Sequence, residues 1–166
     1  MPALESGVLA PEINLTFLDG RKFALKDAFK SGPVVAAFFK VSCPVCQFAF
    51  PYLERIFKAY GRSDKFTFAG VSQDSAADTK AFNREFGITF PTLLDEKGKY
   101  PASSAYGLTN VPTIFLISRE GEIEASIVGW SKLDMEHLNQ QLARINGQPP
   151  APLFAPGERI PDYKPG

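Results

Sequence analysis

The chain has 166 residues, of which 45% are hydrophobic and 22% charged, and its formal net charge at neutral pH is zero. This length and composition are typical of one globular domain that can bury a core. The balanced charge argues against nucleic acid or an anionic membrane surface as a partner. The longest apolar run, residues 33–41, is too short for a transmembrane helix.

The N-terminus and the cysteine count bear on where the protein works. Residues Met1–Glu5 have no basic stretch followed by an apolar one, so we expect no signal peptide in this chain. We therefore expect a cytoplasmic protein, or a periplasmic one if a leader has been removed. Only two cysteines are present, which excludes a secreted scaffold held together by several disulfides.

Strand and helix patterns alternate along the chain. In chain order, the hydrophobic periodicity predicts strands at 13–17, 22–25 and 34–39, a helix at 44–61, a strand at 66–71, a helix opened by Ser75 and closed by Gly87, a strand at 92–94, a hairpin of 113–118 and 123–128, and a helix from Ser131 to Ile145. Strands mixed with helices in this order are typical of an α/β sandwich.

The last twenty residues differ from the rest in composition. We divide the chain into a domain, residues 1–146, and a proline-rich C-terminal tail, residues 147–166. The tail contains six prolines and little apolar content, so we expect no regular element in it. We expect it to lie along the surface in extended form, without a direct catalytic role.

The two cysteines form a C-x-x-C pair, Cys43-Pro44-Val45-Cys46, between a buried strand and a helix N-terminus. A thiol at a helix start faces unpaired backbone N–H groups and the positive end of the helix dipole, and both favour the thiolate. Cys43 is therefore expected to be the nucleophile. Cys46 lies nearly one turn further along, more buried, and is expected to be the resolving thiol.

Three other roles compete for the pair. A structural zinc site needs about four ligands, and the chain offers only these cysteines and the distant His137. A structural disulfide across so small a loop would restrain little of the unfolded chain. Inert buried thiols are the third alternative, because cysteine often packs as a small hydrophobic residue. The setting at a strand–helix junction favours the redox role.

Four segments resemble the TlpA-like thiol–disulfide oxidoreductases, which belong to the thioredoxin superfamily, close to the redoxin and AhpC-TSA group. They are Val34–Cys46, Phe50–Leu53, Phe90–Asp95 and Tyr106–Leu116. The likeness covers about residues 8–145. It implies a thioredoxin-like α/β fold, with a central mixed sheet flanked by helices and an N-terminal β-hairpin extension.

The resemblance also implies how a substrate is held. The proline matching Pro112 is cis in this family and packs against the cysteine pair, although the pattern alone would also allow a trans proline that starts a strand. Val111 is then free to pair with an extended substrate backbone. The predicted substrate groove consists of Ser42, Pro44, Val45, Val111 and Pro112.

The partners follow from the same chemistry. The expected substrate is a protein with a disulfide or a dithiol, and the electrons come from another dithiol carrier, so no metal or organic cofactor is implied. The direction of electron flow and the oligomeric state are not predicted from the sequence.

Three departures from the family pattern stand near the cysteines. Family members often carry Trp at the position of Ser42 and Glu at the position of Ala49, and thioredoxin buries an Asp at the position of Ala37. Proton transfer to and from Cys46 is therefore expected to rely on water or on the substrate thiol.

Two further functions remain as alternatives. A peroxiredoxin needs the pattern P-x-x-x-T-x-x-C, and here Ala36 and Lys40 replace its proline and threonine. A weak thiol-dependent peroxidase is therefore the first alternative. The second is a non-catalytic binding module that uses the groove around Val111 and Pro112.

Overall fold

The computed structural model describes residues 3–61 and 63–166. Its helices are α1 (Leu25–Ala28), α2 (Pro44–Ile56), α3 (Ala76–Phe86), α4 (Pro101–Ala105) and α5 (Lys132–Ile145). Its strands are β1 (Asn14–Phe17), β2 (Lys22–Ala24), β3 (Val34–Phe39), β4 (Thr67–Ser72), β5 (Thr92–Leu94), β6 (Thr113–Ile117), β7 (Ile123–Val128), β8 (Trp130–Ser131) and β9 (Tyr163–Lys164). The strands and helices of the predicted α/β fold are thus confirmed.

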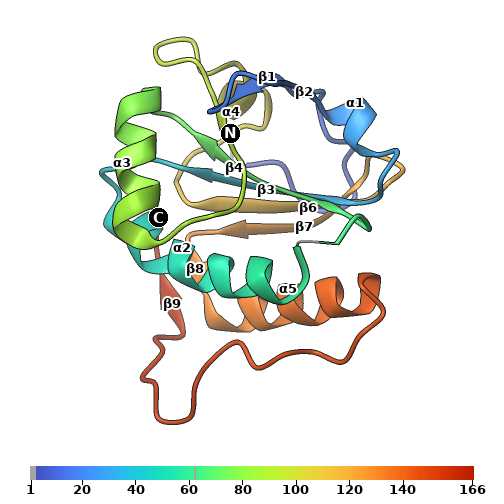
Figure 1. Cartoon of the computed structure of the whole chain (residues 1–166), viewed down its shortest axis with the longest axis vertical. Coiled ribbons are helices and arrows are strands. Elements are labelled where there is room, and N and C mark those ends of the chain that lie inside the picture. The colour runs from blue at the N-terminus through green and yellow to red at the C-terminus, as the bar shows by residue number, and fades with distance from the viewer. Residues whose placement is uncertain (1–2, 62) are drawn as a thin grey trace.

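The described residues form a central mixed sheet with strand order β2-β1-β5-β4-β3-β6-β7 (Figure 1). Strands β3, β4 and β5 run parallel, and β6, β7, β1 and β2 join antiparallel to their neighbours. The first two strands are the expected N-terminal hairpin. Because β3 and β4 are parallel neighbours, their carboxyl ends lie at the same edge of the sheet.

The core has two layers because β3 is buried on both faces. Its six residues alternate between them: Val35, Ala37 and Phe39 pack with α2, α3 and α5, whereas Val34, Ala36 and Phe38 face α1, α4 and the N-terminal segment. This explains the uninterrupted apolar run that predicted a strand covered on both sides. The arrangement also fixes the loop after β3 at the edge of the sheet where α2 begins (Figure 1).

Two predicted elements differ from the structure. The helix expected to reach residue 61 ends as an α-helix at Ile56, and a π-helical turn follows over Phe57–Gly61. There the backbone of Gly61 packs against the ring of Phe57. The prediction of a tail without regular structure is wrong for Tyr163–Lys164, which pairs antiparallel with β8. These two residues lie between prolines and keep the backbone N–H groups that pairing requires.

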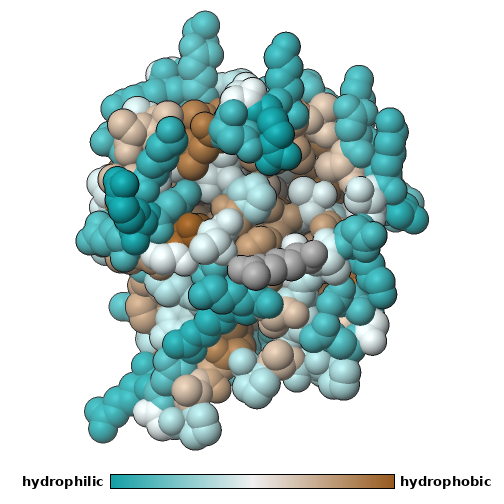
Figure 2. All heavy atoms as spheres, viewed as in Figure 1, coloured by the Kyte–Doolittle hydropathy of each residue, from teal (hydrophilic) through white to brown (hydrophobic). Residues whose placement is uncertain are grey.

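The surface matches the balanced composition. Polar side chains cover much of the face in Figure 2, with apolar side chains showing between them. The large exposed hydrophobic side chains are few, and Leu133 on α5 is one of them. Within the described ranges, none of the helices combines the length and the apolar character needed to cross a membrane.

The C-terminal tail lies across the helical layer, as expected, and returns to β8 (Figure 1). Arg55 on α2 binds both carboxylate oxygens of Glu158, with N–O distances of 2.8 and 2.9 Å. The indole N–H of Trp130 donates to the carbonyl of Pro161 at 2.7 Å. The middle of the tail is therefore attached by an ion pair, by hydrogen bonds and by the side chain of Leu153, which is buried in the core layer that contains α2.

Protonation of Glu158 should loosen the tail locally, around the ion pair with Arg55. Hydrogen bonds from Arg55 are the main reason why the pKa of Glu158 is lowered from 4.5 to about 2. The ion pair therefore stabilises the attached tail fully above about pH 4.5, and this contribution is lost as the pH falls through about 2. We expect amide exchange at Ala155, which donates to Glu158, to be slower in the wild type than in Glu158→Gln at about pH 6, with most of this difference lost at about pH 2. Mass spectrometry, corrected for intrinsic exchange, measures this, and a difference that is undiminished at the lower pH would contradict it.

Candidate active site

Cys43 is the N-cap residue of α2. Its backbone is extended, with φ −83° and ψ 117°, and its sulfur accepts a hydrogen bond from the backbone N–H of Cys46 at 3.3 Å. Pro44 occupies the first helical turn, where a missing N–H costs nothing. The loop from β3 is closed by the Cys43 N–H, which donates to the Lys40 carbonyl at 3.1 Å. The sulfur thus lies at the positive end of α2, a position that stabilises a thiolate.

Cys46 lies one turn into the helix and is fully buried, whereas Cys43 is partly exposed, and both are free thiols. Burial is the main cause that raises the pKa of the Cys46 thiol, and the neighbouring Cys43 and Asp74 act in the same direction. Cys46 is therefore held as a protonated thiol at neutral pH. The two cysteines differ in access and in environment, as the nucleophile and resolving roles require.

The loop before β6 completes the site. The Val111–Pro112 peptide bond is cis, as the resemblance implies. The Cys43 thiol donates to the Val111 carbonyl, with an S–O distance of 3.3 Å. Cys43 and Val111 are 68 positions apart in the sequence. They meet because β3 and β6 are antiparallel neighbours, with Phe38 opposite Thr113.

The other predicted groove residues lie around this contact. Ser42 and Pro44 are exposed on either side of Cys43, Val45 is half-buried, and Pro112 is buried. The structure thus brings Cys43, Cys46 and Val111 together. The parts of Ser42, Pro44, Val45, Val111 and Pro112 in substrate binding remain predictions.

Ala37 and Ala49, two of the departures from the family pattern, are fully buried in the core layer that contains Cys46. Asp74, a residue that the sequence analysis missed, lies beside the loop that carries Cys43. Its carboxylate accepts a hydrogen bond from the Val41 N–H at 2.8 Å. Its negative charge contributes to the raised pKa of the Cys46 thiol. The side-chain amide of Gln47 donates to the Val41 carbonyl at 2.9 Å. The N–H and the carbonyl of Val41 are thus both hydrogen-bonded, which fixes the backbone of the loop before Cys43.

A signal for Asp74 was present in the strand pattern. It follows β4 by two residues, and Phe39 at the end of β3 lies opposite Ser72 at the end of β4. Acidic residues just after the strand parallel to β3 therefore lie beside the loop that carries Cys43, however distant they are along the chain.

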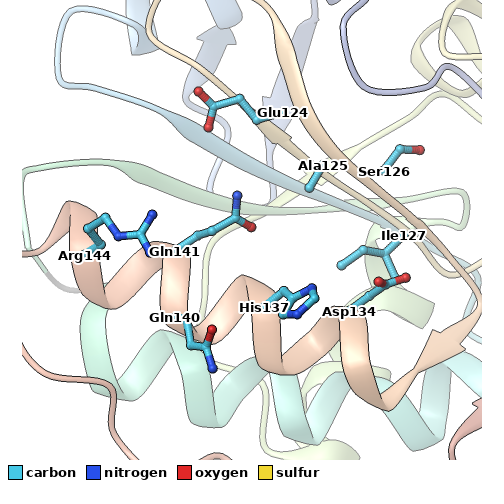
Figure 3. Close-up of a pocket in the computed structure, with 9 residues that line it drawn as sticks. All are labelled: Glu124, Ala125, Ser126, Ile127, Asp134, His137, Gln140, Gln141 and Arg144. Carbon is cyan, nitrogen blue, oxygen red and sulfur yellow. The ribbon is translucent and has the colours of Figure 1, made fainter.

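A separate hollow of about 400 Å³ lies between β7 and α5 (Figure 3). It is lined by polar side chains that include Glu124, His137 and Arg144, and no predicted site residue is among the described residues that line it. Among residues 3–61 and 63–166, no three His, Cys, Asp or Glu side chains gather where they could hold a metal ion.

The sequence matches a known family over most of the domain. The profile of the AhpC/TSA family covers residues 7–126. The chain belongs to this AhpC/TSA family. Its relatives include the thioredoxin-like protein YneN of Bacillus subtilis, which is 31% identical over 138 residues, or 80% of this chain and 78% of that protein.

Two further comparisons point to the same chemistry within the AhpC/TSA family. The thiol–disulfide oxidoreductase ResA of Bacillus thuringiensis is 29% identical over 142 residues, which cover 86% of this chain and 79% of ResA. The crystal structure of the thioredoxin domain of a Bacteroides vulgatus thiol–disulfide oxidoreductase is 28% identical, with a TM-score of 0.72, and covers 84% of this chain and 98% of that one. This AhpC/TSA member is thus a TlpA-like thiol–disulfide oxidoreductase with a thioredoxin fold.

The structure also shows where the two residues lie that replace the proline and threonine of a peroxiredoxin. Ala36 is buried in β3, and Lys40 is exposed directly after it. The hydroxyl that orients a peroxide in the pattern P-x-x-x-T-x-x-C is replaced by an ammonium group. The site therefore favours disulfide exchange over efficient peroxide reduction.

Proposed function

We propose that this chain exchanges electrons with protein disulfides, with Cys43 as the nucleophile and Cys46 as the resolving thiol. The observation that supports this most directly is the position of the Cys43 sulfur. It lies 3.3 Å from the Cys46 N–H nitrogen at the start of α2 and 3.3 Å from the Val111 carbonyl oxygen of the facing loop. A nucleophile at a helix terminus thus lies beside a backbone acceptor that an extended substrate can pair with.

In the first step, the Cys43 thiolate attacks one sulfur of the substrate disulfide. A bond forms between that sulfur and Cys43, the substrate S–S bond breaks, and the leaving sulfur departs as a thiolate that takes up a proton. The backbone N–H of Cys46 stabilises the attacking sulfur before this step. The product is a mixed disulfide between the substrate and Cys43.

In the second step, Cys46 attacks the Cys43 sulfur and releases the second substrate thiolate. The chain then carries a Cys43–Cys46 disulfide, and the substrate has gained two electrons. Since burial keeps Cys46 protonated, this step needs a group that removes its proton. Water or the departing substrate thiolate is our candidate for that acceptor. The reverse sequence oxidises a substrate dithiol by the same steps.

The test is to interrupt the reaction between the two steps. A reduced Cys46→Ser chain mixed with insulin, a protein with accessible disulfides, should accumulate a mixed disulfide through Cys43, because no second thiol releases it. Mass spectrometry under denaturing, non-reducing conditions should detect the adduct, and dithiothreitol should remove it. A chain with both Cys43→Ser and Cys46→Ser is the matched control and should form none. A binding module would give no covalent adduct in either chain, which would refute the proposal.

A further inference from the structure

The end of the tail reaches the loop that faces Cys43. Strand β9 pairs with β8, with Lys164 opposite Trp130, and this carries the chain past α2. The Lys164 ammonium lies 5.2 Å from the centre of the Phe48 ring on α2. The amide of Asn110 donates to the Gly166 carbonyl at 3.0 Å. The segment Tyr163–Gly166, here called the terminal segment, is therefore held by three contacts, with β8, with α2 and with the loop before β6.

Two glycines permit this close approach. A methyl group on Gly166 would lie 2.5 Å from the Val111 carbonyl oxygen and 3.0 Å from the Asn110 β-carbon. Gly129 has a φ of +73°, and a methyl group there would lie 2.5 Å from the Lys164 carbonyl oxygen. Backbone therefore packs directly on backbone, leaving no room for a side chain at either position.

The place that the terminal segment covers matters for the reaction. The same Val111 carbonyl that Gly166 contacts also accepts the hydrogen bond from Cys43. A substrate that docks by main-chain pairing at Val111 needs the space beside this carbonyl. Two main chains cannot occupy that space at once.

We propose that the terminal segment covers the backbone-pairing position of the substrate groove and thereby makes the chain discriminate between small and protein disulfides. The inference rests on the function proposed above. A protein disulfide reaches Cys43 in pairing geometry only after the terminal segment has moved aside. A small disulfide that makes no main-chain pairing reaches the partly exposed sulfur without that movement.

The first experiment shortens the chain so that it ends at Asp162. This leaves the hydrogen bonds to the Pro161 and Asp162 carbonyls in place, so the rest of the tail stays attached. Rates of oxidation of the reduced chain are measured by acid quenching and mass spectrometry, with insulin and with uncharged hydroxyethyl disulfide. We expect the insulin rate to rise about fivefold or more, since only the open form reacts and covering the site therefore multiplies the apparent rate by the open fraction. The rate with the small disulfide should stay within about twofold.

A single substitution tests the same idea without shortening the chain. Gly166→Ala places a methyl group against the Val111 carbonyl and should move the terminal segment away, raising the insulin rate relative to the small-disulfide rate. Tyr163→Ala is the matched control, because its side chain is 63% exposed and should leave that ratio unchanged.

The outcomes separate the two proposals. An insulin rate that is unchanged or lower in both the shortened chain and Gly166→Ala would overturn the inference, provided that hydroxyethyl disulfide still oxidises Cys43. A reduced wild-type chain that reacts with neither disulfide would instead overturn the proposed function itself.

Discussion

Replacing Cys43 with serine is expected to lower the rate of insulin reduction by at least about a thousandfold, because a serine hydroxyl is not ionised at neutral pH and is a far weaker nucleophile than a thiolate. The fold should be unaffected, since the side chain is partly exposed and serine also caps helices well. Turnover with dithiothreitol as the electron donor, followed by the turbidity of reduced insulin, measures the loss.

An exposed serine outside the site provides the control for this variant. Ser31→Ala removes an exposed hydroxyl at the opposite end of β3 and should keep most of the activity. If Cys43→Ser retained a tenth or more of the turnover, about 1.4 kcal/mol or less of transition-state stabilisation would depend on that sulfur. Cys43 would then not be the nucleophile.

The largest loss of stability is expected for Trp130→Ala. The indole is fully buried, and its ring centre lies 4.9 Å from that of Phe48 and 5.1 Å from that of Tyr52. Removing it also leaves the Pro161 carbonyl without its donor. We expect the free energy of unfolding to fall by about 3–5 kcal/mol, the range for large aromatic side chains in a core. Urea unfolding followed by circular dichroism measures this.

Two substitutions calibrate that result. Trp130→Phe keeps an aromatic ring and should cost less than Trp130→Ala, because the cavity is smaller. Leu133→Ala changes a neighbouring side chain that is 61% exposed and should stay within about 0.5 kcal/mol of the wild type. A loss below about 1 kcal/mol for Trp130→Ala would show that α2 and the tail close over the gap.

The fold was predictable because local patterns and long-range packing agree. The apolar run Val34–Phe39 is a doubly covered strand, and Ser75 and Ser131 accept from backbone N–H groups at the helix starts that the sequence indicated. Gly87 ends its helix with a φ of +68°. Each of these signals lies within a few residues of the element that it defines.

The site was predictable only in part. The junction between β3 and α2 indicated where Cys43 would lie, and the resemblance supplied Val111 and Pro112. Asp74 was missed because its relation to Cys43 depends on which strands are neighbours in the sheet. The position of Gly166 was missed for another reason: its contact with Val111 is made by main chain, and a glycine carries no residue-type signal for a binding partner.

The path of the tail also bears on how the protein can be handled. Any residues attached after Gly166 would emerge next to the Val111 carbonyl and hence beside the reacting thiol. An affinity tag, a fluorophore or a surface linkage at that end would therefore crowd Cys43. Attachment through an exposed position at the opposite end of β3, such as Glu120 in the turn between β6 and β7, keeps the thiol open to its substrates.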